Sequence, residues 1–181
     1  AFVMDTTPKE ISLIKEMYEK INLYKKTAIN VFTYYDDVDW LEELFQLNVN
    51  GIGLDFVNGR NNLKNLMSLG SSVLKDKTLF AGFVDGTNIW KTNIRKACIN
   101  LDYLAKMTKE IVVSNAGPLY HLPVTIEGET HFSHFLFRHL SFATEKLDEL
   151  YLLRDRNSIK YNKHVGQSNS VVQDRVNSLK D

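Results

Sequence analysis

The polar residues best suited to chemistry follow apolar, strand-like segments. Asp55 and Asn58 come at the end of one apolar run, and Ser114 and His121 follow another. In parallel βα architectures the carboxyl ends of the strands meet at one edge of the sheet and hold the ligand there. A carboxylate, an amide, a hydroxyl and an imidazole at that edge could bind a small polar ligand. These four residues are therefore the ligand-facing candidates.

Each candidate also has a structural interpretation. Residues of these types cap helices and close turns, and His121 in its loop suits that role. Asp55 is different because its neighbours Leu54, Phe56 and Val57 are apolar. A carboxylate in such surroundings must be hydrogen-bonded or paired. A structural role and a ligand-facing role both stay open for Asp55.

The other reactive residue types form no recognisable catalytic or metal-binding motif. His131 and His134 are three residues apart, so on a helix they would share a face and could hold a metal. The interleaved phenylalanines favour partly buried packing roles for these two and for His139. Cys98, the only cysteine, has apolar neighbours and is expected in the core. With no nucleophile elbow and no phosphate loop in the sequence, we expect no catalytic residue and no metal ligand.

Four apolar segments are expected to form the strands that position these residues. They cover residues 28–35, 51–59, 78–86 and 111–113. Each runs into a polar or glycine-rich turn, and a helical pattern follows. Strands that alternate with helices predict a parallel sheet with right-handed crossovers. The last strand is expected to be buried and to open into a loop that ends at Pro123.

Amphipathic stretches predict the helices. The first begins at Pro8, with Thr6 or Thr7 as its N-cap, and ends near residues 25–26. Asp36 or Asp37 is expected to cap the second helix. Further helices are predicted over residues 61–69, about 93–109 and about 130–156. The whole chain, 1–181, is predicted to be one domain in which residues 160–181 form a polar tail with a short helix.

The number of units decides the predicted fold. A closed (βα)8 barrel needs eight units in typically ~250 residues, and this chain offers four. We therefore predict an α/β fold: a partial (βα)8 TIM-type barrel of about four parallel βα units with a long C-terminal helix. The opening residues AFVMD read like the end of a strand, so we expect a piece of something longer or a chain that pairs with another copy. Unpaired sheet edges favour self-association.

The composition excludes several classes of partner. The 22 basic and 22 acidic residues give a formal net charge of zero, which argues against a broad nucleic-acid-binding surface. No apolar run approaches the about 20 residues that cross a bilayer, so no membrane partner is expected. The single cysteine suits a reducing, cytoplasmic location.

Four runs carry a family resemblance: GLDFVNG, LFAGFVDGTNIWK, SNAGPLYHLPVTIE and the helix that ends LDELYLLRD. They resemble the C-terminal half of the N-terminal domain of cobalamin-independent methionine synthase. In the family, one corresponding stretch is a small-residue strand followed by GxxxGRNxW, and another is a strand with an LLHxP loop. The order and spacing agree from Phe2 to Leu179. AFVMD looks like the residues that follow the family's DEP strand end. The resemblance implies two face-to-face (βα)8 barrels in the full-length enzyme.

The resemblance also implies where the chemistry lies. In the family, the C-terminal barrel holds zinc, which activates homocysteine to take a methyl group from 5-methyltetrahydropteroyl-triglutamate in methionine biosynthesis. The N-terminal barrel is structural, and its basic residues near the polyglutamate tail belong to segments absent here. By the same resemblance, Thr33–Tyr35, Asp55 and Gly117 stand where the catalytic barrel has its zinc ligands. The sulfur and imidazole ligands are missing, so we expect no cofactor and no activity from this chain alone.

Two further hypotheses stay open. A half-barrel could pair with itself as a homodimer, or with the missing barrel half, and bind a small ligand at the mouth formed by Asp55, Asn58, Ser114 and His121. The chain could also be a complete enzyme of another barrel class, such as a decarboxylase. That reading needs a catalytic constellation that the sequence does not contain.

Overall fold

The computed structural model describes residues 6–156. The expected N-terminal strand end and the predicted tail over residues 160–181 lie outside the described residues. The main helices are α1 (Pro8–Tyr24), α2 (Leu41–Gln46), α3 (Asn62–Leu69), α4 (Ile94–Leu104), α5 (His134–Phe137) and α6 (Ala143–Arg154). Two short 3-10 turns are η1 (Ser71–Val73) and η2 (Leu119–His121). None of the helices within residues 6–156 is both long enough and apolar enough to cross a membrane.

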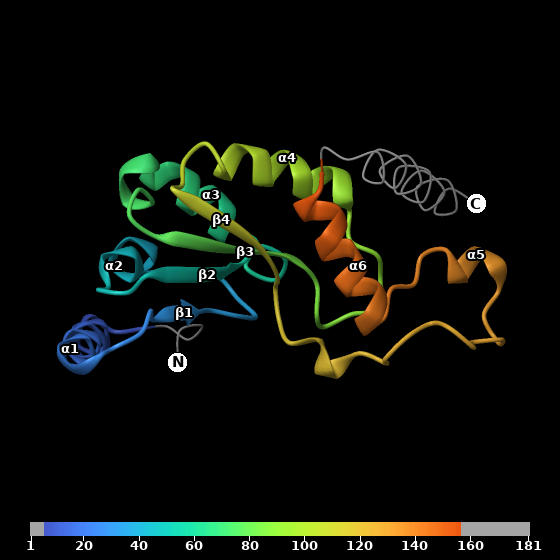
Figure 1. The fold of residues 1–181 in the computed structure, drawn as a ribbon, viewed down its shortest axis with the longest axis horizontal. Coiled ribbons are helices and arrows are strands. Elements are labelled where there is room, and N and C mark those ends of the chain that lie inside the picture. Colours follow the sequence, from blue (N-terminus) through green and yellow to red (C-terminus); the bar gives the residue numbers. More distant parts are fainter. Residues whose placement is uncertain (1–5, 157–181) are drawn as a thin grey trace.

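Four parallel strands form one sheet in chain order: β1 (Asn30–Phe32), β2 (Gly51–Asp55), β3 (Thr78–Val84) and β4 (Glu110–Asn115). Figure 1 shows them side by side, with α3 and α4 gathered along one side. A doubly wound sheet reverses its strand order at a switch point, whereas a βα barrel adds each strand beside the last. The predicted α/β class and partial-barrel order are therefore confirmed.

One face of the sheet forms the core. Val31, Ile52 and Leu79 lie side by side in register on this face, and none is more than 4% exposed. Helical side chains cover them, among them Leu44, Leu66 and Leu101. Burying each large aliphatic side chain contributes about 1.5–3 kcal/mol. Cys98 also lies in this core, as predicted.

The ends of two helices agree with their sequence signals. Thr7 is the N-cap of α1 and forms a capping box with Glu10. Gly70 ends α3 with a φ of 78°, a conformation that glycine adopts without steric cost. The prediction for α2 was wrong, because Asp37 does not cap it. The Asp37 carboxylate instead accepts hydrogen bonds from the backbone N–H groups of Asn61 and Asn62 (2.7 and 3.1 Å), at the start of α3.

The long C-terminal helix predicted over residues 130–156 is also wrong. It is divided into α5, of four residues, and α6, of twelve. Between them, Leu140 forms an isolated antiparallel bridge with Trp90, and Ser141 N–H donates to the Ile89 carbonyl at 2.8 Å. This pairing uses backbone groups that a continuous helix would need for itself. His131 and His134 are exposed, so the expectation that they are partly buried was wrong, whereas His139 is buried.

The last strand is less buried than its sequence suggests. Ile111 and Val113 are partly covered, whereas Val112 is 36% exposed. Within the described residues β4 pairs only with β3. An apolar run of this kind is typical of a strand buried on both faces, and here it forms an edge.

Candidate functional site

Asp55 organises the carboxyl ends of β1 and β2. The residue is 0% exposed, and its carboxylate oxygens accept four hydrogen bonds. The Oδ1 atom accepts from the backbone N–H groups of Val57 and Asn58, both at 2.8 Å. The Oδ2 atom accepts from the Tyr35 backbone N–H at 2.9 Å and from Asn58 Nδ2 at 3.0 Å. This carboxylate therefore ties the loop after β1 to the loop after β2.

Asn62 extends this polar centre by one layer. It is fully buried at the start of α3, and its Nδ2 atom donates to the carbonyls of Asp55 (2.9 Å) and Asp36 (3.1 Å). Its Oδ1 atom accepts from the Val38 N–H at 2.8 Å. All these partners are main-chain groups of loops at the strand ends. The arrangement fixes loop geometry and leaves the buried polar atoms paired, as buried polar groups require.

The four predicted candidates do not form one open site. Asp55 and Asn58 bond to each other, whereas Ser114 lies two strands away, joined to Asp55 through Gly82 in the strand register. The Ser114 hydroxyl donates to the Asn115 carbonyl at 2.9 Å. His121 is exposed in η2, with its ring centroid 4.1 Å from that of Tyr120.

Tyr35 lies across the mouth of the half-barrel. It follows β1, yet a Cβ atom at Gly117, after β4, would stand 3.3 Å from the Tyr35 ring. The pKa of the Tyr35 hydroxyl is raised, mainly by desolvation and to a lesser extent by the neighbouring Tyr120. Tyr35 is also the one non-glycine residue among those described with a positive φ, 78°. Such a conformation costs of order 1 kcal/mol and persists only when the surroundings hold it, as Asp55 does through the Tyr35 N–H.

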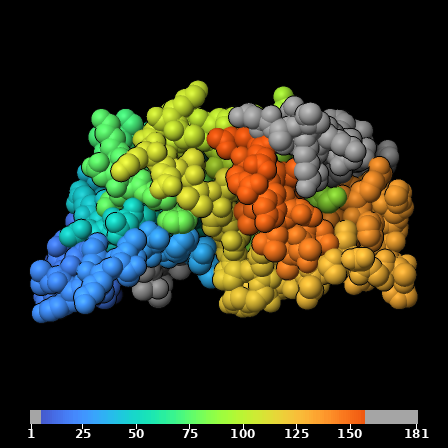
Figure 2. Space-filling view, viewed as in Figure 1, coloured from blue at the N-terminus to red at the C-terminus, as the bar shows by residue number. Residues whose placement is uncertain are grey.

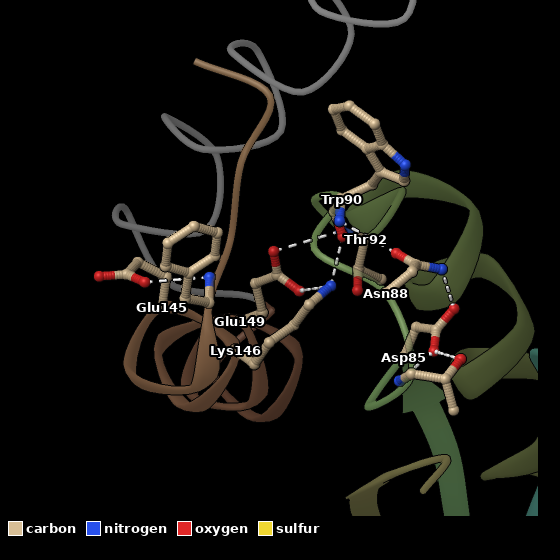
Figure 3. Close-up of polar contacts among 9 residues, drawn as sticks. Asp85, Asn88, Trp90, Thr92, Glu145, Lys146 and Glu149 are labelled. Carbon is tan, nitrogen blue, oxygen red and sulfur yellow. Dashed lines mark hydrogen bonds and ion pairs between the residues drawn. The ribbon is translucent and has the colours of Figure 1, made fainter. Parts of the chain in front are cut away.

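A second buried charged centre lies at the end of β3. Lys146 of α6 is 0% exposed, and its ammonium group donates to the Trp90 carbonyl and faces the Glu149 carboxylate at 3.6 Å. Glu149 in turn accepts from the Thr92 N–H at 3.2 Å. Figure 3 shows Lys146 and Glu149 reaching from α6 to the loop that holds Trp90 and Thr92. Burial lowers the pKa of Lys146, and the nearby carboxylates of Glu149 and Asp85 oppose that shift.

The loop itself is shaped by Asp85. Its carboxylate accepts from the Thr87 N–H and hydroxyl, both at 2.7 Å, and from the Asn88 amide. A cleft of about 370 Å³ lies beside this loop, between it and α4. Lys91 lines the cleft, and burial lowers the pKa of its amine. The Asp85 carboxylate thus accepts hydrogen bonds from residues two and three positions further along the same turn.

Comparison with known proteins identifies the family. The sequence profile described as "Cobalamin-independent synthase, N-terminal domain" matches residues 1–109. The chain belongs to this family. A 5-methyltetrahydropteroyltriglutamate–homocysteine methyltransferase of Lactococcus lactis subsp. lactis is 40% identical over 167 residues, which are 91% of this chain and 21% of that protein. The protein of that name from Thermodesulfovibrio yellowstonii is 38% identical over 156 residues, or 85% and 21% of the two chains.

The family resemblance inferred from the strand-end motifs is thus confirmed. A third relative, from Lactococcus lactis subsp. cremoris strain SK11, is 34% identical along 100% of this chain and 25% of its own length. The chain therefore spans about a fifth to a quarter of the length of these relatives. All three relatives carry the same name.

Three places in this member of the cobalamin-independent synthase family, at Thr33–Tyr35, Asp55 and Gly117, were matched by resemblance to zinc-ligand positions. The Thr33 hydroxyl donates to the Gly53 carbonyl at 3.1 Å within the sheet. Asp55 is saturated by N–H donors. Gly117 offers no side chain and lies against Tyr35.

Two features of the structure were not predicted from the sequence: the buried Lys146–Glu149 pair and the positive φ of Tyr35. The Lys146–Glu149 pair has a weak signal, since both residues lie on the helical face that also carries Phe142 and Leu153, at spacings of three and four. Charged residues on an otherwise buried stripe indicate a buried pair. The backbone conformation of Tyr35 has no comparable signal, because tyrosine shows no preference for positive φ.

Proposed function

We propose that this chain is a non-catalytic, structural part of the N-terminal barrel in cobalamin-independent methionine synthesis. The reaction is methyl transfer from 5-methyltetrahydropteroyl-triglutamate to homocysteine, and this chain would support it without performing it. The observation that carries the proposal is the state of Asp55. It is the single carboxylate at the positions equated with zinc ligands, and its two oxygens accept four N–H groups.

Hydrogen-bond capacity supports this reading. A carboxylate has about four lone-pair sites, and at Asp55 each is matched by a donor within 3.0 Å. Turning an oxygen toward a metal would break hydrogen bonds from the part-buried N–H groups of Tyr35, Val57 or Asn58, at up to about 1–3 kcal/mol each. Zinc is held in proteins by three or four Cys, His or carboxylate ligands. Thr33 and Gly117 are not ligands of these types.

The position of Tyr35 supports the same conclusion. Ligands of βα barrels bind above the carboxyl ends of the strands. In this chain Tyr35 spans that position from the end of β1 to Gly117, while Asp55 lies buried and holds the Tyr35 backbone. The mouth is thus used for loop packing.

A methyl-transfer assay tests the proposal. The purified chain is supplied with zinc, homocysteine and 5-methyltetrahydropteroyl-triglutamate, with the Lactococcus lactis relative as the active reference. We expect methionine from the relative and none from this chain. Zinc-dependent methionine formation by the chain, abolished by Asp55→Asn, would overturn the proposal.

A chimera tests the supporting role. The segment of the Lactococcus lactis protein that matches this chain over 167 residues is replaced by this chain's sequence. Since the proposed role is structural, the folded chimera should retain methyl transfer. A chimera that folds, binds zinc in its own catalytic barrel and yet makes no methionine would contradict a purely structural role.

A further inference from the structure

A cleft lies between α4 and the loop after β3, away from the edges of the sheet. Its walls come from the carboxyl ends of β2 and β3, the loop that holds Trp90 and the first turns of α4. β2 and β3 lie between β1 and β4 in the strand order, so neighbouring strands are present on both sides of the cleft. Its volume of about 370 Å³ is in the lower part of the range for small-molecule sites, about 300–1,000 Å³.

Two of the acceptor groups that line the cleft are used within the loop itself. The Asp85 carboxylate accepts from the Thr87 N–H, the Thr87 hydroxyl and the Asn88 amide. The Asn88 Oδ1 atom accepts from the Trp90 N–H at 3.0 Å. These oxygens are therefore already bonded to donors of the protein.

Several donor groups of the cleft have no acceptor within residues 6–156. The ammonium groups of Lys91 and Lys96 form no hydrogen bond and no ion pair with these residues. Asn93 Oδ1 accepts from the Lys96 N–H at 3.0 Å, which leaves the Asn93 NH2 group as the unused end of that amide. Asn100 adds a second amide whose side chain forms no hydrogen bond in the described part of the chain. A surplus of donors that includes two cations suits an anionic ligand.

The carboxylates nearest Lys91 are bonded to other residues. Glu149 and Glu145 of α6 oppose the lowering of the Lys91 pKa that burial causes. Glu149 faces Lys146 at 3.6 Å, and Glu145 accepts from the Thr125 hydroxyl at 2.7 Å. Both belong to α6, which runs along the face of the molecule seen in Figure 2 (orange to red). Since neither carboxylate forms an ion pair with Lys91, the amine can bind a ligand in the cleft.

The cleft also has aromatic walls. The rings of Phe56 and Phe83 are stacked, with centroids 4.9 Å apart and planes at 23°. Trp90 lines the cleft as well and is 39% exposed. Aromatic faces pack favourably against flat rings. The cleft therefore combines cationic donors with surfaces for a planar group.

We propose that this cleft binds a small phosphate monoester that carries a flat ring. The phosphate oxygens would accept from Lys91, Lys96 and Asn93, and the ring would lie against Trp90. Lysine binds phosphate as a point charge, whereas the arginine fork matches a planar carboxylate. Among the described residues that line the cleft the two cations are lysines and none is an arginine, which favours phosphate.

This inference is independent of the proposed function, because Asp55 does not line the cleft. A catalytic Asp55 would leave the phosphate site untouched. A cleft that binds no phosphate ester would equally leave the role of Asp55 in the loops untouched.

Fluorescence titration of the full 181-residue chain with phenyl phosphate tests the site. The chain has two tryptophans. Trp40 is 5% exposed, whereas Trp90 lines the cleft, so a ligand there should change mainly the emission of Trp90. We expect a saturable change that Trp90→Phe removes.

Charge variants locate the phosphate. Lys91→Gln and Lys96→Gln each remove one positive charge, so each should raise the dissociation constant about tenfold. Lys64→Gln is the matched control, because Lys64 is an exposed lysine of α3 outside the cleft. It should leave the dissociation constant unchanged.

Three results would overturn the proposal. One is the absence of a saturable change at millimolar phenyl phosphate in a chain with native circular dichroism. Another is equal affinity for phenol, because the charge would then contribute nothing. The third is tighter binding of benzoate, which would assign the site to carboxylates. If Lys91→Gln loses native circular dichroism, the exposed Lys96 decides, and an unchanged dissociation constant in Lys96→Gln contradicts the proposal.

Discussion

Asp55 and Lys146 are both fully buried charged residues near the carboxyl ends of strands, but they are stabilised in different ways. Within residues 6–156 Asp55 has no counter-ion, and four N–H donors from its own loop and the neighbouring one stabilise its carboxylate. Lys146 has a counter-ion, Glu149, on its own helix, and donates to the carbonyl of Trp90, 56 residues earlier. The Asp55 centre joins two neighbouring strand-end loops, mainly through backbone N–H groups, and the Lys146 centre joins parts of the chain more than 50 residues apart.

The difference shows what a buried charge can do in a half-barrel. Backbone N–H groups satisfy an anion without bringing a second charge out of water, so the Asp55 centre avoids a second desolvation cost. The Lys146–Glu149 pair desolvates two charges, and its attraction offsets that cost only if its geometry holds. The pair therefore fixes α6 on the loop after β3. Loss of its geometry would destabilise the fold more than loss of one hydrogen bond at Asp55, because two buried charges would be left without compensation.

Lys146→Met should have the largest effect. It leaves the Glu149 carboxylate buried without its cation, and breaking a buried pair in this way costs about 3–5 kcal/mol. Urea denaturation followed by circular dichroism measures the loss in the free energy of unfolding. A loss below about 1 kcal/mol, the range of exposed pairs, would show that the pair is solvated.

The double variant Lys146→Met/Glu149→Met sharpens this test. Replacing both members of a buried pair by apolar residues is often neutral or stabilising, although the bond to the Thr92 N–H is lost as well. The double variant should therefore be more stable than Lys146→Met alone. If the two losses simply add, the residues are not coupled and the account of this centre fails.

Asp55→Asn should have the next largest effect. The amide keeps one oxygen but turns an NH2 group toward N–H donors, so at least one part-buried donor loses its acceptor, at about 1–3 kcal/mol. Asp36→Asn is the matched control, because Asp36 is exposed and, among the described residues, its carboxylate accepts only from the N–H of the next residue, Asp37. Thermal denaturation of both variants checks the expected order, and equal stabilities would remove Asp55 from the structural role.

The pH dependence of stability separates the two centres. Burial holds the pKa of Lys146 below its ordinary 10.5, so the folded state binds fewer protons than the unfolded state between the two values. Stability must then rise with pH through that window, up to about 10.5. The free energy of unfolding of the wild type, minus that of the Lys146→Met/Glu149→Met variant, should increase as the pH rises toward about 10.5. A difference that falls with pH would mean that the ion pair outweighs burial.

Thr7→Ala should have the smallest effect, because it removes a cap at an exposed helix end. The loss of the bond from the Glu10 N–H should cost about 1 kcal/mol or less, concentrated in α1. Hydrogen exchange of α1, compared with Thr27→Ala at an exposed position outside any helix, measures it. A global loss of protection would show that α1 is integral to the core.

Local signals in the sequence were sufficient for much of the fold. Thr7 and Pro8 indicated the start of α1, the helical pattern over residues 61–69 indicated α3, and the alternation of apolar runs with helical stripes indicated a parallel sheet. Asp55 was recognised as unusual because its neighbours are apolar. Two of its partners, Val57 and Asn58, lie two and three residues away, so the sequence contained that turn, whereas the bond from the Tyr35 N–H, 20 residues earlier, depends on the fold.

The features that the sequence did not reveal depend on long-range contacts. The helix predicted over residues 130–156 is divided because Leu140 pairs with Trp90, 50 positions earlier, and no local pattern reports that pairing. The hydrogen bond from Lys146 to the Trp90 carbonyl was also missed, because its partners are 56 residues apart and no local pattern reports it. The exposure of Val112 arises because β4 is an edge within the described residues, and a run of apolar residues looks the same at an edge as at the centre of a sheet.

We propose that the Asp55 carboxylate holds the strand-end loops together and is not available to a metal or substrate. The most direct test is the thermal midpoint of the wild type and of Asp55→Asn, each with and without zinc and homocysteine. A ligand that binds the folded state raises the midpoint in proportion to RT ln(1 + [L]/Kd). We predict that Asp55→Asn lowers the midpoint and that zinc with homocysteine shifts both proteins equally. A zinc-dependent rise in the wild type that disappears in Asp55→Asn would contradict the account.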